Sequence, residues 1–312
     1  MHGGILHVNH IKDQIHCERA YRMGLSGKGI GVAVLDTGIF LHRDFDSRVT
    51  GFADMVNRRN FAYDDCGHGT HICGIIGGSG RMSGGRYSGI APGCNLIMVK
   101  VLDRKGNGYY SDVLAGISWD LERKEQLGIR ILNISVGACS KRGMSENSAL
   151  VKGVNRAWDA GLVVVVAAGN NGPRTMSITT PGSSRKVITV GCSDDDREVL
   201  VGGNRMVDYS GRGPTAACIC KPDLVAPGCS VVSCSSRADK YTIKSGTSMS
   251  TPIVSGAVAL LLERFPDMSN KDVKLTLRER SVDIGIPRNQ QGRGLLDVGK
   301  KLERKRKQTK TY

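Results

Sequence analysis

The stretch from Ile30 to Asp36 reads Ile-Gly-Val-Ala-Val-Leu-Asp, an apolar run that ends in a carboxylate. Its β-branched residues suit a strand that is buried on both faces. Runs of the same kind recur further along the chain, at Leu96–Leu102, Ile129–Ile134, Leu162–Ala168 and Val187–Val190. We therefore expect Ile30–Leu35 to be the first strand of a sheet built from these runs.

Helical segments separate several of the runs. Residues Ser111–Leu127 place apolar side chains at helical spacing, with Ser111-Asp112 as the predicted cap, and Glu146–Ala160 repeats the pattern before Gly161 ends it. This alternation predicts an α/β fold with a central, mostly parallel β-sheet and helices on both faces.

Polar groups follow three of the predicted strands. Asp36, Gly137 and Asn170 each come just after an apolar run. In open α/β sheets the functional crevice lies at the carboxyl ends of the strands, so we expect these residues to meet there.

Composition is that of a globular protein, since the 312 residues are 40% hydrophobic and 23% charged. No polar or Pro-rich linker divides the chain, which indicates one domain. The longest apolar runs are shorter than the roughly 20 residues of a membrane span. Residues 1–16 lack the apolar core of a secretory signal. We therefore expect neither a membrane span nor a secretory signal. We also expect most of the ten cysteines to be free thiols in a reducing compartment.

The formal charge of +15 is concentrated in part at the C-terminus. The residues responsible there are Lys300, Lys301, Arg304, Lys305, Arg306, Lys307 and Lys310. No aromatic stacking motif or nucleic-acid module accompanies them, so we interpret them as a solvated basic tail and expect no specific nucleic-acid partner. No membrane partner is expected either.

Hydrolysis by a serine hydroxyl requires a base, a carboxylate that orients the base, and donors for the oxyanion. Asp36 supplies a carboxylate at a strand end. For the base, His68 lies between Gly67 and Gly69, which allow close approach of a substrate, whereas His71 is expected to pack inside the following helix.

The serine segment runs Lys244-Ser-Gly-Thr-Ser-Met-Ser-Thr-Pro252 and leads into a long apolar helix. A serine near a helix N-terminus lies where negative charge is stabilised. Composition alone leaves Ser245, Ser248 and Ser250 open as nucleophiles, because all three have the same chemistry.

Together these segments resemble the signatures of subtilisin-like serine proteases, the peptidase family S8. The matching stretches are Asp36-Thr-Gly, Gly-His68-Gly-Thr-His, Ala-Ala-Gly-Asn170 and Gly-Thr-Ser248-Met-Ser-Thr-Pro. The chain order Asp, His, Ser is also the subtilisin order. Further segments, Gly51–Asn57, Tyr209–Thr215 and Lys221–Gly228, are similar to AprX-type subtilases, a group associated with the bacterial cytoplasm. The resemblance implies a subtilisin-like single-domain fold with an N-terminal segment 1–24, a catalytic domain 25–302 and a basic tail 303–312.

The resemblance also implies roles for individual residues. Ser248 is the nucleophile, His68 the general base and Asp36 the carboxylate that orients it, while Asn170 and the Ser248 backbone N–H donate to the oxyanion. Substrate-binding walls are implied for Ser135, Val136, Gly137, Ala167, Ala168 and Gly169. The implied activity is that of a serine endopeptidase, with proteins or peptides as substrates.

Some positions depart from the family pattern. Many relatives bind calcium on the loop that corresponds to Gly77–Gly89, but this loop has no carboxylate here, although Asp44 matches one ligand position. Cys218 and Cys220 lack the second ligand pair of a zinc site. We therefore expect no metal and no cofactor. Cys66 stands two residues before His68, so modification of its thiol is expected to disturb the base.

A competing interpretation is a catalytically silent subtilase fold that binds peptides. Such a protein could lose any member of the triad, whereas this chain retains all three. A nucleophile-elbow hydrolase is excluded, because Gly246-Thr-Ser248-Met-Ser250 lacks the final glycine of that motif.

Overall fold

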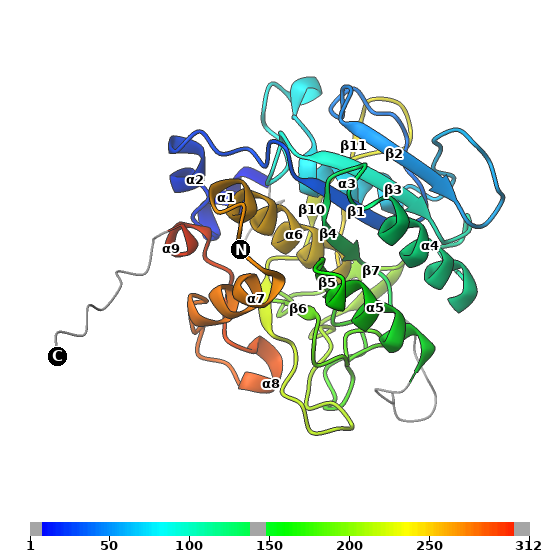
Figure 1. Ribbon diagram of the computed structural model, residues 1–312. Helices are drawn as coiled ribbons and strands as arrows, with labels where there is room; N and C mark the ends of the chain where they lie inside the picture. The colour runs from blue at the N-terminus through cyan, green and yellow to red at the C-terminus, as the bar shows by residue number, and fades with distance from the viewer. Residues whose placement is uncertain (1–7, 138–147, 303–312) are drawn as a thin grey trace, which may run out of the picture.

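The computed structural model describes residues 8–137 and 148–302. The predicted basic tail 303–312, and the first residues of the predicted helix Glu146–Ala160, lie outside the described residues. Within the described part, a seven-stranded sheet occupies the centre of the molecule (Figure 1). Its strands, in spatial order, are β2 (Val49–Asp54), β3 (Asn95–Lys100), β1 (Gly31–Asp36), β4 (Ile129–Ile134), β5 (Val163–Ala167), β6 (Ile188–Cys192) and β9 (Leu224–Ala226).

Every neighbouring pair in this sheet is parallel. Two antiparallel hairpins stand beside it, one formed by β10 (Val231–Cys234) and β11 (Tyr241–Lys244), the other by β7 (Val199–Val201) and β8 (Asn204–Met206). The predicted α/β class and parallel sheet are confirmed. The five predicted strands are β1, β3, β4, β5 and β6, with ends that differ by at most two residues.

Helices cover both faces of the sheet. The principal ones are α3 (His68–Gly77) and α6 (Thr247–Arg264) on one face, and α4 (Tyr110–Arg123) and α5 (Ala149–Asp159) on the other (Figure 1). The remaining helices are α1 (Val8–Gln14), α2 (Glu18–Arg22), α7 (Asn270–Glu279), α8 (Arg288–Gln291), α9 (Val298–Lys301) and the short 3₁₀ helix η1 (Arg81–Ser83).

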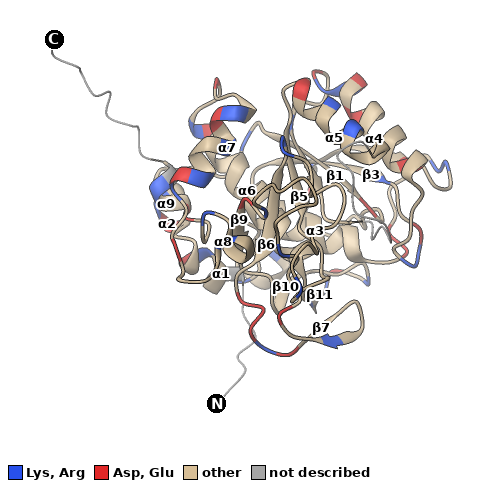
Figure 2. Cartoon of the chain, turned by 90° about the horizontal axis from the view of Figure 1, so that it is seen from below, with Lys and Arg blue, Asp and Glu red and all other residues tan. Residues whose placement is uncertain are grey.

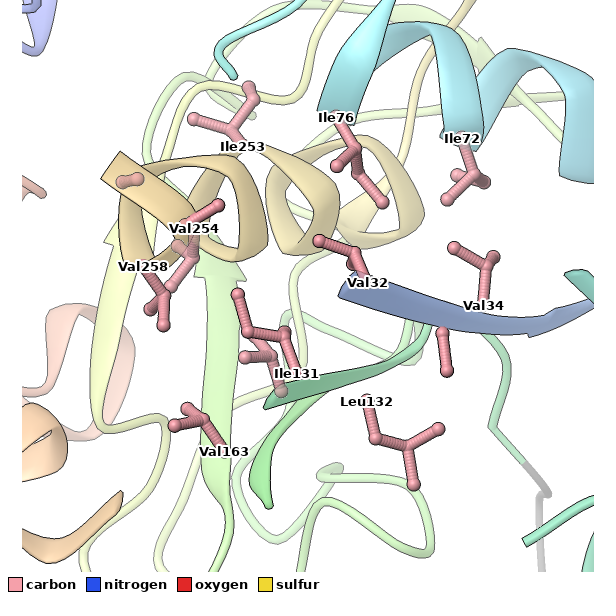
Figure 3. Close-up of a cluster of buried hydrophobic side chains, with 14 of the residues drawn as sticks. Val32, Val34, Ile72, Ile76, Ile131, Leu132, Val163, Ile253, Val254 and Val258 are labelled. Carbon is pink, nitrogen blue, oxygen red and sulfur yellow. The ribbon is translucent and has the colours of Figure 1, made fainter. Parts of the chain in front are cut away.

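Successive side chains of each strand point to opposite faces of the sheet, so helices must pack on both faces to bury them. Val32 and Val34 of β1 point toward Ile76 and Ile72 of α3 (Figure 3), whereas Leu35 points to the opposite face, against Gly116 of α4. Strands buried on both sides in this way read as continuous apolar runs. Figure 3 also shows side chains of α6, among them Val254 and Val258, packed beside the sheet.

One helix start differs from the expectation. The predicted cap at Ser111-Asp112 is wrong, because α4 begins at Tyr110 after Tyr109, and no side chain caps it. For α5, Ser148 Oγ accepts a hydrogen bond from Val151 N, and the helix ends before Gly161, whose φ is +91°.

Lys and Arg are interspersed with Asp and Glu over the outer helices (Figure 2). None of the helices in the described ranges has the length and apolarity to cross a membrane.

Candidate active site

Asp36 and His68 form a buried pair at the carboxyl end of β1. The Asp36 side chain is fully buried, and its two carboxylate oxygens lie 2.8 and 2.9 Å from His68 Nδ1. His68 begins α3 directly after Gly67, whose φ is +88°, and its side chain remains 21% exposed. The imidazole is therefore held on one side by a carboxylate and reaches solvent on the other.

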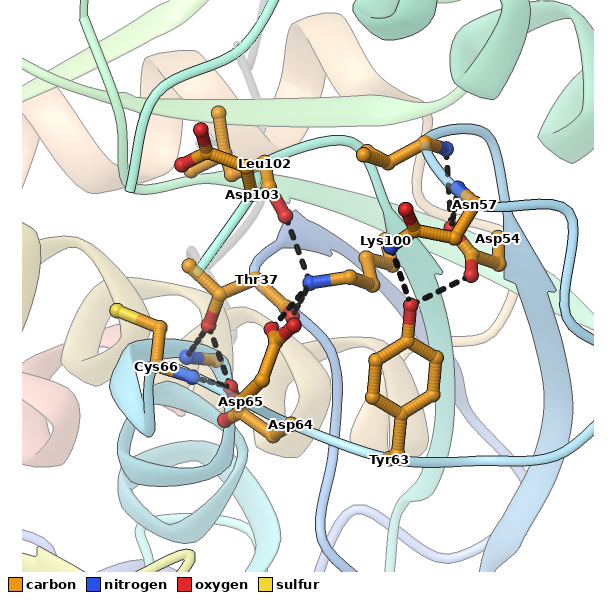
Figure 4. Close-up of polar contacts among 12 residues, drawn as sticks. Thr37, Asp54, Asn57, Tyr63, Asp64, Asp65, Cys66, Lys100, Leu102 and Asp103 are labelled. Carbon is orange, nitrogen blue, oxygen red and sulfur yellow. Dashed lines mark hydrogen bonds and ion pairs between the residues drawn. The ribbon is translucent and has the colours of Figure 1, made fainter. Parts of the chain in front are cut away.

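The loop before His68 is held by the carboxylate of Asp64. This carboxylate accepts hydrogen bonds from the Thr37 hydroxyl and the Cys66 backbone N–H, at 2.9 and 3.1 Å (Figure 4). It also accepts from the Thr70 hydroxyl and the Gly67 backbone N–H, at 2.6 and 2.7 Å. Thr37 is the residue next to Asp36. One partly buried carboxylate thus joins the end of β1 to the start of α3.

A buried lysine completes this network. Lys100, the last residue of β3, donates to the backbone oxygens of Thr37 and Leu102 at 2.6 and 2.8 Å, and lies 2.7 Å from the Asp65 carboxylate (Figure 4). Its side chain is fully buried. Sequence reasoning did not single out Lys100, whose burial depends on the neighbouring strands.

His71 has the structural role expected of it. It is fully buried, and its Nε2 lies 3.1 Å from the Val231 oxygen and 3.2 Å from the Thr242 oxygen. Burial lowers the pKa of His71 to about 3, so the ring is neutral at physiological pH. It ties α3 to the β10–β11 hairpin and does not reach the cavity beside His68.

The three serines of the Ser245–Ser250 segment have different surroundings. Ser248 is the second residue of α6 and lines the same cavity as His68. Ser245 Oγ accepts from Ser230 N at 2.9 Å, and Ser250 Oγ is buried without a hydrogen-bond partner among the described residues. Ser248 Oγ donates to the Ser135 carbonyl oxygen at 2.7 Å and, within the described ranges, has no hydrogen bond to His68.

Asn170 lies beside the N-terminus of α6. Its Oδ1 accepts from Thr247 N and from Thr247 Oγ1, both at 3.0 Å. Its Nδ2 donates to no other residue in the described part of the chain. Tethering of Oδ1 sets the orientation of the amide and leaves the amide hydrogens available to a ligand.

These groups border a cleft of about 450 Å³. Of the six residues predicted to bind substrate, five line it: Ser135, Val136, Gly137, Ala167 and Gly169. Ala168 does not; it is buried, and its carbonyl accepts from Thr179 N at 2.9 Å. Thr179 lies against both Gly137 and Gly169, where added side chains would collide with it.

Two cationic side chains of the cleft were not predicted. Lys105 and Lys244 line it together with Cys66. Lys244 ends β11, four residues before Ser248, and Lys105 lies in a loop, but neither lysine carries a sequence signal that distinguishes a cleft from open solvent.

The guanidinium group of Arg48 joins the start of the Gly77–Gly89 loop to two neighbouring segments. Arg48 donates to the backbone oxygens of Gly77, Cys94 and Asp44, at 2.5, 3.2 and 2.6 Å. The Asp44 carboxylate accepts from Met82 N and from the Tyr241 hydroxyl, at 2.9 and 2.7 Å. Each of these oxygens has a protein partner, and the absence of calcium from this loop stays a prediction.

Comparison with known proteins identifies the family of the chain. The model of the subtilase family, peptidase S8, matches residues 27–294. Serine protease AprX of Bacillus subtilis is 43% identical over 282 residues, which are 84% of this chain and 64% of that protein. Subtilisin DY of Bacillus licheniformis is 33% identical over 286 residues, covering 91% of this chain and 94% of that protein.

Solved structures show the same likeness. Sphericase superposes with a TM-score of 0.73 at 31% identity, covering 88% of this chain and 93% of that one. A cold adapted subtilisin-like serine proteinase gives a TM-score of 0.71 at 29% identity, covering 88% and 90%. The chain therefore belongs to the subtilase family of serine proteases and has the subtilisin-like fold. The match to AprX spans less than two thirds of the length of that relative.

Proposed function

We propose that this chain is a serine endopeptidase in which Asp36, His68 and Ser248 act as a catalytic triad. The observation that carries the proposal is the contact of 2.8 Å between His68 Nδ1 and the buried Asp36 carboxylate. This contact holds the ring in the tautomer with a proton on Nδ1, so that Nε2 is free to act as a base. Ser248 lines the same cleft, at the N-terminus of α6.

The reaction begins when Ser248 leaves the Ser135 carbonyl and turns toward His68 Nε2. A rotation about one side-chain bond is a small change compared with the barrier of peptide hydrolysis. His68 takes the hydroxyl proton as Oγ attacks the scissile carbonyl, and then gives that proton to the leaving amine. Water hydrolyses the acyl-enzyme by the same route in reverse.

The oxyanion is stabilised by two donors, the Asn170 amide and the Ser248 backbone N–H. Thr247 holds Asn170 Oδ1, which presents the NH₂ group to the cleft. Preorganised donors of this kind stabilise the charge that develops in the transition state, and the N-terminus of α6 adds its positive dipole end.

The substrate binds as an extended peptide between two backbone segments, residues 135–137 and 167–169. Gly137 and Gly169 permit close approach of its backbone, and Thr179 between them limits the depth of the primary pocket. We propose unfolded proteins and peptides as substrates, with side chains of modest size before the cleaved bond.

The proposed reaction uses side chains and water and requires no metal or cofactor. All nine cysteines in the described ranges are free thiols. Free thiols fit a reducing compartment, and we propose the bacterial cytoplasm.

Casein hydrolysis and fluorophosphonate labelling of the intact protein, compared with Ser248→Ala, test the function. Ser245→Ala is the matched control, since it removes a neighbouring hydroxyl outside the cleft. We expect both signals in the parent and in Ser245→Ala, and neither in Ser248→Ala. Absence of both signals from a folded parent would instead favour the silent peptide-binding module.

A further inference from the structure

Two cysteines, an aspartate and a tyrosine converge at the end of the sheet, beside the β7–β8 hairpin. Cys192 is the last residue of β6, and Cys229 follows β9 by three positions. Cys192 Sγ lies 3.0 Å from Asp194 Oδ1, and Tyr209 Oη lies 3.1 Å from each sulfur. The two sulfurs and the carboxylate oxygen are all within 4.8 Å of one another.

The cluster leaves a buried carboxylate oxygen without a partner. Asp194 Oδ1 accepts from Gly228 N and Cys229 N, at 2.7 and 3.2 Å. Asp194 Oδ2 is buried and has no hydrogen bond within the part of the chain that the structure describes. A buried charged oxygen left unpaired is costly, so this oxygen calls for a cation or a donor.

The sulfurs lie in an apolar enclosure. Cys192, Cys229 and Tyr209 are buried with Val201, and Met206 packs against them. Apolar surroundings lower the local dielectric and strengthen the attraction between a cation and its ligands.

We propose that Cys192, Cys229 and Asp194 bind a thiophilic divalent cation of the zinc class. Two sulfur ligands and one carboxylate match the preferences of Zn²⁺, which takes four ligands in a tetrahedron. Water from the adjoining cavity fills the fourth position, while the Tyr209 hydroxyl, which contacts both sulfurs, stays protonated as their hydrogen-bond partner.

Binding must displace the two thiol protons, which pass to solvent. Affinity should therefore rise with pH.

A cavity of about 430 Å³ gives access to the cluster. Cys192 and Asp194 line it together with Asp195, Asp196 and Asp208, and also with Arg212, whose guanidinium pairs with Asp208 at 3.0 Å, so that Asp195 and Asp196 keep the entrance acidic. The acidic run before β7 is visible as a red segment in Figure 2. Negative charge around an entrance raises the local concentration of divalent cations.

Two other groups are weaker candidates. Cys218 and Cys220 are exposed. In the cluster of His42, Asp44 and Cys234, both Asp44 oxygens accept hydrogen bonds, and His42 Nε2 lies 3.1 Å from the Lys240 oxygen. The proposal departs from the expectation of no metal, which considered only the Cys218–Cys220 pair and the Gly77–Gly89 loop.

A metal bound by Cys192, Cys229 and Asp194 would stabilise the segments next to the N-terminus of α6. Gly228, which donates to Asp194, accepts through its oxygen from Gly246 N at 3.0 Å, and Gly246 immediately precedes α6. Zn²⁺ should therefore raise the melting temperature by linking β6, β9 and the start of α6.

The test is a Cd²⁺ titration of the intact, reduced, metal-free protein, followed by sulfur-to-cadmium charge-transfer absorption, with Zn²⁺ uptake measured by elemental analysis. We expect one equivalent bound, at least tenfold weaker binding in Cys192→Ala, Cys229→Ala and Asp194→Asn, and no change in Cys234→Ala or in the double variant Cys218→Ala/Cys220→Ala. Zn²⁺ should raise the melting temperature of the parent but not that of the three ligand variants.

Binding that survives in Cys192→Ala and Cys229→Ala, or that is lost in either control, would overturn the proposal. So would a Cys192–Cys229 disulfide in the isolated protein together with no metal uptake after reduction. If a variant fails to fold, X-ray absorption by the Zn²⁺-loaded parent decides: two sulfur neighbours support the site, and coordination by nitrogen and oxygen alone rejects it.

Discussion

Lys100 and Asp65 form an ion pair with a separation of 2.7 Å, in which the lysine side chain is fully buried and the aspartate is 38% exposed. The same ammonium group donates to the oxygens of Thr37 and Leu102. The pair therefore connects three segments that border the active site: the end of β1, the loop before His68 and the chain after β3.

Replacing Lys100 with Met should lower the free energy of unfolding by about 3 kcal/mol. The carbonyl oxygens of Thr37 and Leu102 would lose their hydrogen-bond donor, and the Asp65 carboxylate would lose its ion-pair partner. Urea denaturation measures the change. Lys152→Met, on an exposed position of α5, is the control and should change stability by less than about 0.5 kcal/mol. Equal effects of the two substitutions would show that the Lys100 network does not stabilise the fold.

Asn170→Ala should reduce kcat by about 10²- to 10³-fold with little change in KM, the magnitude found when the side-chain oxyanion donor of a subtilisin is removed. Asn170→Asp keeps the shape of the side chain but replaces the donor with a negative charge, so its kcat should be at least as low. Steady-state kinetics on a peptide substrate measure both. A parental kcat in Asn170→Asp would contradict the oxyanion role.

Asp120 on α4 is fully buried, and neither of its carboxylate oxygens has a hydrogen-bond partner among the described residues. Burial raises the pKa of Asp120 well above its ordinary value. The folded state then holds a proton that the unfolded state releases above about pH 4, so this group lowers stability as pH rises, by about 1.4 kcal/mol per pH unit until the folded carboxyl titrates.

Asp120→Ala and Asp120→Asn should both remove this slope, because neither side chain titrates. Thermal unfolding from pH 4 to pH 8 measures it, and the advantage of each variant over the parent should grow with pH. Parallel stability curves for parent and variants would mean that Asp120 has an ordinary pKa in the folded state.

Arg48→Met should lower the free energy of unfolding by about 2 to 3 kcal/mol, because three backbone oxygens lose a charged donor. Arg43→Met is a matched control, since that side chain is 69% exposed. Added calcium should not restore the stability of Arg48→Met. Recovery with calcium would show that the Gly77–Gly89 loop retains a metal site.

Cys66 is half-buried and lines the cleft beside His68. Alkylation with iodoacetamide should inactivate the parent by crowding the imidazole. The rate should increase with pH because the thiolate is the nucleophile, and burial, which raises the pKa of the Cys66 thiol, moves this increase to higher pH. Cys66→Ser should resist, although the exposed Cys218 and Cys220 are modified in both proteins. If the parent and Cys66→Ser are inactivated at the same rate, the thiol whose alkylation inactivates the protein is not that of Cys66.

Local pattern was sufficient for the elements that build the sheet. Ile129–Ile134 was predicted with the bounds of β4, and the apolar run before Asp36 placed the carboxylate at the end of β1. Buried parallel strands are readable in this way because both of their faces demand apolar, β-branched residues. The cap of α4 was misread, because many Ser-Asp pairs do not cap helices and the choice depends on backbone geometry.

By itself, then, the sequence determined the α/β class, the subtilase family and the strand ends that carry Asp36 and Asn170, since these depend on residues close together in the chain. Composition left three serines open and the family resemblance implied Ser248. Only the tertiary structure decided that Ser248 bonds to Ser135, that Lys100 is buried, and that Cys192 meets Cys229. Those contacts join segments far apart in the chain, and they are set by the order of strands in the sheet and the packing of α3 and α6 against it.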